Sequence, residues 1–219
     1  MKKSNYLFFA SLYFFFSSVT DCNNKISENQ SEAIKFKTFI YVDKQGTGIE
    51  AFRILIPSNW EFDGEINWLL DNPSMPAVAS FRVYNIDGKE EFEVFPNQPF
   101  FWTNNQMLLS MFPVGSRYFG NEVHSPVSPL EALKNIVIPR FRNHVNNFKI
   151  TKEEHLPELA ESLGAGMQSQ PGVFSTADGA KISVNYEVNR VEMEEELYGV
   201  VEQISFPIQT MYGTATNTI

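Results

Sequence analysis

The sequence predicts an α+β domain: a twisted, mostly antiparallel sheet with one main helix packed on a face, or, as an alternative arrangement, an α-β-α sandwich. Three observations predict it. The turn pair Asp87-Gly88 separates two alternating runs, a capped helical stretch begins at Ser128, and apolar and polar residues alternate without error from Ala180 to Asn189.

The Asp87-Gly88 pair is a strong signal for a two-residue hairpin loop. That loop sets the register of the two flanking strands. It places Val83 across from Phe92, Phe81 across from Val94, and Arg82 across from Glu93. A slip of one residue would destroy all three favourable pairs. We therefore expect a hairpin whose four apolar side chains point inward.

The main helix is predicted between Ser128 and about Val145. Ser128 can cap it, Pro129 suits its first position, and Glu131 completes a capping box three residues after the cap. Apolar residues then recur at helical spacing. Pro139 lacks a backbone donor, so we expect a kink or an interruption there.

Other elements follow from alternation and from helix and strand breakers. We expect strands over 50–56, 148–151, 180–188 and 197–206, and a second short helix over 157–163. The stretch 60–68 is expected to be a loop, and the acidic run 194–196 is expected on the solvated approach to the last strand.

The N-terminus is typical of an export signal. Lys2 and Lys3 precede an apolar run over 6–19, which is too short to cross a bilayer core that needs roughly 20 apolar residues. We expect residues 1–21 to be a cleaved signal peptide and 22–35 a flexible tether. Residues 36–219 would then form a single domain.

The only cysteine, Cys22, directly follows the apolar run. Val19-Thr20-Asp21-Cys22 resembles the lipobox of bacterial lipoproteins, in which the cysteine receives lipid and becomes the mature N-terminus; Asp21 stands where that pattern normally has Gly, Ala or Ser. We expect an extracytoplasmic, membrane-anchored lipoprotein. The alternative is a secreted or periplasmic protein cut within 17–20, with Cys22 left as a thiol in a tail.

The charge balance is acidic. The chain has 17 Lys and Arg against 26 Asp and Glu, a net charge of −9. Loss of residues 1–21 would leave 15 and 25, a net charge of −10. This disfavours nucleic acid and anionic lipid as partners, so membrane contact is expected only through an N-terminal lipid. One cysteine allows no internal disulfide, so the fold depends on its core.

No catalytic, metal or cofactor motif is found. No serine stands in a Gly-x-Ser-x-Gly pattern, and there is no His-Glu-x-x-His. His124, His144 and His155 are too far apart for a local metal motif. We predict no catalytic residue, no metal and no cofactor, and we interpret each histidine as a surface residue.

Aromatic side chains are the one unusual concentration. They could line a groove for a small molecule, a glycan or a protein segment, although such residues are more often core packing. The candidate groove residues are Trp60, Trp68, Phe100, Phe101 and Trp102.

A family resemblance rests on residues 50–105. Ile56-Pro57-Ser58-Asn59-Trp60, Asn72-Pro73, the stretch 82–88 and Phe101-Trp102 resemble the recurring pattern of uncharacterised secreted bacterial and archaeal proteins. More distantly, a strand ending in Ile-Pro and followed by Trp is similar to the PsbP-like fold of oxygen-evolving-complex extrinsic proteins, an α-β-α sandwich. The resemblance implies export and a fold but supplies no catalytic residues.

Two functions remain open. The preferred hypothesis is a non-catalytic binding or scaffolding module of unknown ligand, displayed outside a membrane. The alternative is a secreted hydrolase whose site combines a carboxylate such as Glu91 or Glu93 with a histidine. A cleft with convergent carboxylates or histidines would favour the enzyme, and an aromatic groove without such groups would favour binding.

Overall fold

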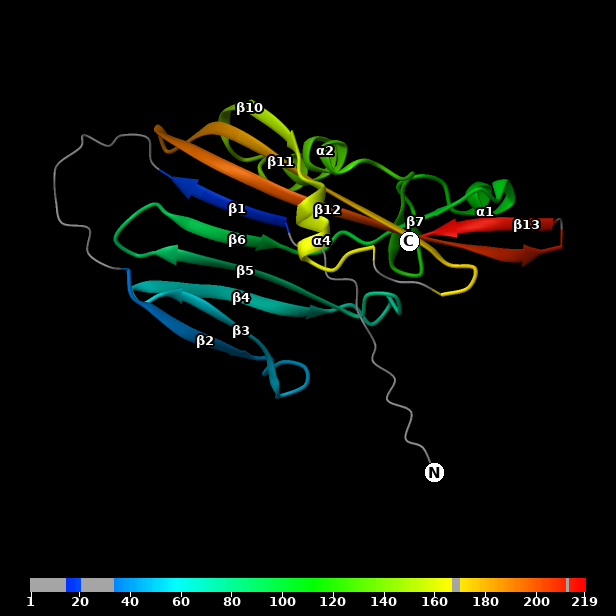
Figure 1. The fold of residues 1–219 in the computed structure, drawn as a ribbon, viewed down its shortest axis with the longest axis horizontal. Helices are drawn as coiled ribbons and strands as arrows, with labels where there is room; N and C mark the ends of the chain where they lie inside the picture. Colours follow the sequence, from blue (N-terminus) through cyan, green and yellow to red (C-terminus); the bar gives the residue numbers. More distant parts are fainter. Residues whose placement is uncertain (1–14, 21–33, 167–169, 212) are drawn as a thin grey trace.

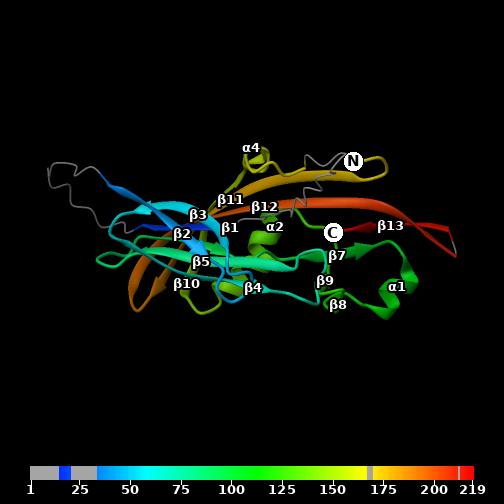
Figure 2. The ribbon, with the colours of Figure 1, turned by 90° about the horizontal axis from the view of Figure 1, so that it is seen from below.

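The computed structural model describes the backbone of residues 15–20, 34–166, 170–211 and 213–219. The predicted mostly antiparallel sheet is confirmed. Helices contribute less than expected, so the molecule is predominantly β rather than a clear α+β sandwich. The physical reason is that the helical segment is short and interrupted, and that the second sheet face is covered in part by a β-hairpin (Figures 1 and 2).

One long strand, β12, organises the main sheet (Figure 1). One of its edges pairs first with β1 and then with β13, while the other edge pairs with β11, which also pairs with β10. The strands of the path are, in spatial order, β4 (Trp60–Trp68), β5 (Ala77–Asn85), β6 (Glu91–Phe95), β1 (Phe15–Thr20), β12 (Val191–Thr210), β13 (Gly213–Thr218), β7 (Phe100–Thr103), β9 (Asn121–Val123) and β8 (Arg117–Tyr118); β10 spans Asn146–His155 and β11 spans Phe174–Val188.

The predicted β5–β6 hairpin is confirmed with its register. Phe81 pairs with Val94 and Val83 pairs with Phe92. Phe81, Val83 and Val94 are buried and Phe92 is half-buried. The last backbone hydrogen bond joins Asn85 N to the Glu90 carbonyl at 2.9 Å, so the loop is one residue pair longer than predicted while the register is unchanged.

A second hairpin covers one face of this sheet. Strands β2 (Phe36–Val42) and β3 (Glu50–Pro57) pair with each other and form a separate two-stranded sheet. Ile56, Phe81, Val83 and Val94 form its buried contact with β5 and β6. The hairpin thus occupies the place that a second helical layer would take in a sandwich (Figure 2).

The prediction of a loop over 60–68 is wrong, because these residues form strand β4. Half-buried residues alternate along it with exposed ones from Trp60 to Ile66. Gly64 suggested a turn, yet it lies against β5: a Cβ there would meet the Phe81 Cβ at 2.2 Å. The glycine permits close approach of the two strands.

The main helix begins as predicted and then changes form. Ser128 Oγ accepts a hydrogen bond from the Glu131 backbone N–H at 3.3 Å, and the Glu131 carboxylate accepts one from the Ser128 N–H at 2.9 Å. The segment runs through α2 (Pro129–Ala132), a π-helical turn η1 (Leu133–Val137) and α3 (Ile138–Phe141). It ends before Val145. The interruption expected at Pro139 takes the form of this π turn, because proline has no N–H for the α-helical bond.

The helical segment packs on the face of the sheet opposite the β2–β3 hairpin. Its contact buries Leu133 and Val137 against Ile182, Val184 and Leu197. The alternation predicted for residues 180–188 is confirmed from Ala180 to Tyr186, within a longer strand, whereas Val188 is exposed. The remaining helices are short: α1 (Gln106–Met111) and α4 (Pro157–Ser162).

The acidic run 194–196 was expected to be solvated, and this is wrong for its central residue. The run lies inside β12, and Glu195 is only 1% exposed. Its charge is tolerated there because the Arg142 guanidinium binds it. The sequence did not indicate this burial, because Glu194 and Glu196 flank Glu195 and a run of like charges usually lies on a solvated face.

The predicted N-terminal segments lie largely outside the described residues, including Cys22 and most of the tether. Residues 15–20 of the predicted signal peptide form β1, which is antiparallel to both β6 and β12. In the described part of the chain, no helix is long and apolar enough to span a membrane.

Candidate functional site

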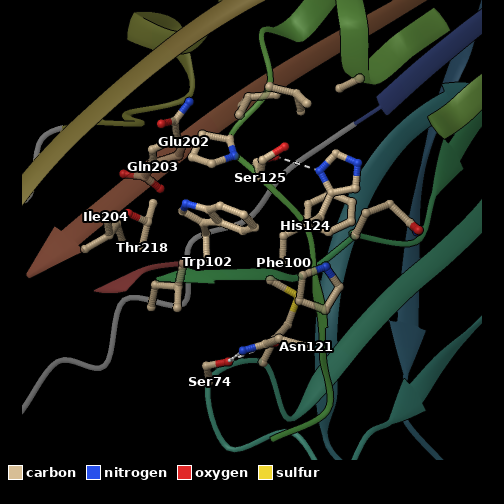
Figure 3. A pocket seen from close by; sticks show the side chains of 18 of the residues that line it. Ser74, Phe100, Trp102, Asn121, His124, Ser125, Glu202, Gln203, Ile204 and Thr218 are labelled. Atoms are coloured by element: carbon tan, nitrogen blue, oxygen red, sulfur yellow. Dashed lines mark hydrogen bonds between the residues drawn. The ribbon is translucent and has the colours of Figure 1, made fainter. Parts of the chain in front are cut away.

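An apolar pocket lies between β7, the second half of β12 and the segment that leads into α2 (Figure 3). Its volume is about 120 Å³. Segments far apart in the sequence supply its wall: the loops after β4 and β6, strand β7, residues 121–127, residues 200–204 of β12 and the end of β13.

Side chains alternate between the two faces of β7, so only some of its aromatic residues face the pocket. Phe100 and Trp102 line it, whereas Phe101 is buried on the other side, where its ring lies 4.4 Å from that of Tyr118. Pairing fixes β7 on both edges, because it is parallel to β9 and antiparallel to β13. Trp102 stands across from Thr218 in the latter pair.

One end of the pocket is closed by a buried polar network. The Asn72 amide donates to Asn121 Oδ1 at 2.8 Å, and the Asn121 amide lies 3.0 Å from Ser74 Oγ. Asn72 is only 1% exposed, and its Oδ1 accepts from Ser74 and Met75 N–H groups. These groups bond to one another, so they hold the floor rigidly.

Gly120 makes this floor possible. Its φ is +78°, and a Cβ there would lie 2.6 Å from the Asn72 Cβ. Glycine is therefore required at this position for two reasons, the left-handed backbone and the close approach to Asn72.

Glu202 lines the wall at another point (Figure 3). Its Oε1 accepts hydrogen bonds from the Gly166 N–H at 2.7 Å and from Ser175 Oγ at 3.1 Å. The carboxylate thus anchors the segment around Gly166 to β12. Its observed bonds are structural ones.

His124 is the second titratable side chain on the pocket wall. Its Nδ1 lies 2.6 Å from the Ser125 carbonyl oxygen (Figure 3). A carbonyl oxygen can only accept, so Nδ1 carries a proton in this contact. The His124 ring packs against Phe100, with centroids 5.1 Å apart. His124 is half-buried, so it reaches the surface as predicted for each histidine, and it also lines the pocket, which was not predicted.

Arg140 closes the outer side of Phe100. Its guanidinium lies 5.9 Å from the ring centroid and donates to Glu122 at 2.7 Å and to Gln98 at 2.5 Å. The two bonds fix the cation above the ring. Phe100 thus contacts both Arg140 and His124.

Size and composition restrict what the pocket can bind. A volume of about 120 Å³ is close to that of the engineered cavity of about 150 Å³ that accepts benzene. Trp102, Phe100, Val200 and Ile204 offer apolar surface, and polar groups stand at its ends. The geometry suits one small ring or a short apolar chain that carries a polar substituent.

A second hollow, of about 550 Å³, lies beside the first half of β12 and is lined in part by Arg142, Glu91 and Glu93. Arg142 donates to both oxygens of Glu195, at 2.6 and 2.9 Å, and to Glu93 Oε2 at 2.8 Å. The guanidinium also lies 4.9 Å from the Phe95 ring centroid. We call Arg142, Glu93 and Glu195 the arginine clasp.

Burial and charge shift several pKa values around the arginine clasp. Burial alone would lower the pKa of Arg142, but its bonds to Glu195 and Glu93 raise it above the usual value. Burial, followed by the Glu93 charge, raises the pKa of Glu91. Burial and the nearby Glu195 also raise the pKa of Tyr186. Glu91 lies beside the clasp, in the same hollow as Glu93 and Arg142.

The five candidate groove residues do not form one groove. Phe100 and Trp102 share the apolar pocket, and Phe101 lies behind them. Trp60 packs against the core beneath the β2–β3 hairpin. Trp68 is 41% exposed, and its Nε1 donates to Asp43 Oδ2 at 3.1 Å, which pins the β2–β3 loop.

Sequence reasoning missed Asn121, His124 and Glu202 as pocket residues. Nothing in their local sequence marks them, because the pocket joins segments as distant as Ser74 and Ile219. One available signal was the period-2 pattern of residues 100–103, which separates Phe100 and Trp102 from Phe101.

Comparisons with protein-family models, curated proteins and solved structures found no match to this chain. Among the described residues, no group of three or more His, Cys, Asp or Glu side chains is arranged to hold a metal ion.

Proposed function

We propose that this protein is an exported, lipid-anchored, non-catalytic binding module, and that the apolar pocket takes a small ligand with a ring or a short apolar chain. The observation that carries the proposal is the pair Phe100 and Trp102, held side by side on a rigid wall. Aromatic faces bind apolar rings and the apolar faces of sugars.

The polar groups of the pocket support binding over catalysis. Asn121 and Ser74 bond to each other, and Glu202 is bonded to Gly166 and Ser175. A catalytic base would need a reacting group within hydrogen-bond reach, with its own position held by a third group. Among the residues that the structure describes, His124 is the only imidazole on this wall.

The test uses fluorine NMR with two probes, fluorobenzene and a fluorinated monosaccharide. We expect saturable fluorobenzene binding, and Trp102→Ala should weaken it about tenfold, which corresponds to about 1.4 kcal/mol. Trp68→Ala is the matched control and should leave binding unchanged, because Trp68 lies at the β2–β3 loop. Monosaccharide binding alone would identify a glycan site. Failure of both probes would refute the pocket as the ligand site.

Export and anchoring are tested separately. Metabolic labelling with a fatty-acid analogue should mark the wild-type protein, and Cys22→Ser should abolish the label and release the protein from the membrane. Stable anchoring requires more than one acyl chain, as a lipoprotein provides. An unlabelled, soluble wild-type protein would leave Cys22 as a tail residue and refute the anchor.

A secreted hydrolase is the second candidate, and one observation favours it. Glu91 and His144 line the same hollow, and the raised pKa of Glu91 suits a general acid. Its companion Glu93 is bound to Arg142. Hydrolysis of nitrophenyl esters or glycosides that is lost in Glu91→Gln would establish this alternative.

The family resemblance also stays a proposal. The helical segment on one face of an antiparallel sheet supports a distant relation to the α-β-α arrangement of PsbP-like proteins. The hairpin on the other face argues for a different second layer.

A further inference from the structure

Strand β1 occupies a slot one strand wide in the middle of the main sheet. Its residues pair on one side with β6 and on the other with β12, both antiparallel. β6 and β12 therefore run parallel to each other, about 9–10 Å apart. The segment in the slot belongs to the predicted signal peptide, so its removal on export would empty the slot.

The two walls are held in place without β1. β6 is bonded to β5 on its far edge, and β12 to β11. The arginine clasp joins the walls directly, because Glu93 stands on β6 and Glu195 on β12. The clasp reaches across from the helical face, so it does not depend on hydrogen bonds to β1.

Closure of the slot by a shift of β6 would disturb both cores. Phe95 stacks on Phe141 at 4.6 Å in the helix-side core. The preceding residue, Val94, is 2% exposed in the core beneath the β2–β3 hairpin. A shift of one strand spacing would pull both side chains out of well-packed positions.

We propose that the mature protein uses this slot to bind an extended apolar strand of another exported polypeptide. Unpaired strand edges are templates for a further strand, whose main-chain bonds give affinity and whose side chains give specificity. The positions in the slot face Phe92, Val94 and Phe95 of β6 and Leu197 and Tyr198 of β12, and also five glutamates, Glu91, Glu93, Glu194, Glu195 and Glu196. The end of the slot at Val94, Phe95 and Tyr198 therefore favours apolar residues in the incoming strand. The tether over 23–33 is rich in Asn, Glu, Gln and Ser, so it fits poorly. The inference rests on the proposed export.

The experiment uses the mature protein, purified from the envelope of an exporting host. Its N-terminus is first determined by intact mass. Retention of residues 15–20 would refute both the export proposal and this inference. In the cleaved protein, hydrogen exchange should be fast at the β6 and β12 amides that face the slot and slow at those that face β5 and β11.

The probe is a fluorescent synthetic peptide of residues 14–21, which contains the strand seen in the slot. We expect saturable binding, and exchange at the slot amides should slow about tenfold or more. The matched control is the same peptide with Ser17→Pro, which removes a backbone donor at a position paired with both Glu93 and Leu197. It should bind at least about tenfold more weakly, a loss of about 1.4 kcal/mol.

Two results in the cleaved protein would overturn the inference and leave export intact. Slot amides that are protected without peptide would show that the sheet has closed or that the tether fills it. Equal binding of the proline peptide would show that the probe attaches to apolar surface rather than as a strand.

Discussion

The two halves of β12 differ in what surrounds their buried side chains. In its first half, Glu195 is fully buried and both its oxygens bind Arg142. In its second half, Val201 and Ile204 line a pocket whose volume is about 120 Å³. One strand therefore contributes to an ionic cluster at one end and, at the other, to a mainly apolar pocket wall that also holds the buried Glu202. The buried charge at Glu195 therefore serves stability, whereas the apolar pocket offers surface that a ligand can contact.

The helical segment connects these two regions. Ala132, near its start, lines the apolar pocket, and Arg142, directly after its end, forms the arginine clasp. The continuous helical segment from Pro129 to Phe141 therefore links the two regions, so a structural change at one of them can be transmitted to the other. The following variants separate the roles of the two regions.

The largest effect is expected for Arg142→Met. Removal of the cation leaves Glu195 buried without a partner, which should lower the free energy of unfolding by about 3–5 kcal/mol. The double variant Arg142→Met with Glu195→Leu should recover most of the loss, since Glu93 can reach solvent. Urea unfolding measures both. A single variant as stable as the wild type would contradict the structural role of the clasp.

Next comes Gly120→Ala, which acts at the pocket floor. A left-handed backbone costs a non-glycine residue about 1–2 kcal/mol, and here the new Cβ also meets Asn72 at 2.6 Å. Gly115→Ala is the matched control, with φ +86° and open space around the Cβ. Gly120→Ala should lose more stability in urea unfolding and weaken fluorobenzene binding. Equal losses of stability in the two variants would show that the pocket floor accommodates the added Cβ without an energetic penalty.

Ser128→Ala tests whether the helix couples the two regions. Loss of the cap should cost about 1 kcal/mol. If the helix start also positions Ala132, the variant should weaken fluorobenzene binding. Ser110→Ala is the control: this hydroxyl bonds only to the Gln106 carbonyl on an exposed helix face, and a change within about 0.5 kcal/mol is expected. Unaltered binding in Ser128→Ala would show that the regions are independent.

The smallest effect is expected for Glu91→Gln, and it depends on pH. The folded state raises the pKa of Glu91, so folding holds its proton more tightly than the unfolded chain does. Stability due to this group therefore falls as pH rises from the ordinary carboxyl pKa through the raised value. Thermal unfolding should show Glu91→Gln to be more stable than the wild type at neutral pH and equal to it near about pH 4. The opposite order would mean that the Glu91 charge is stabilised.

Local patterns were enough for several elements. The Asp87-Gly88 turn set the register of β5 and β6, because side chains alternate across a strand and only one register pairs apolar with apolar residues. The Ser128 capping box set the helix start. Residues 60–68 were misjudged because Gly64 signals a turn locally and serves strand packing in the fold.

The sequence by itself determined a mostly antiparallel sheet, the main hairpin register and the start of the main helix, since each depends on residues close together in the chain. It also predicts an acidic, exported protein. Only the tertiary structure decided which aromatics share a pocket, that Glu195 is a core residue, and that β1 lies between β6 and β12. Those features join residues 50 or more positions apart, as Arg142 and Glu195 are, and such contacts depend on how the layers pack rather than on any local pattern.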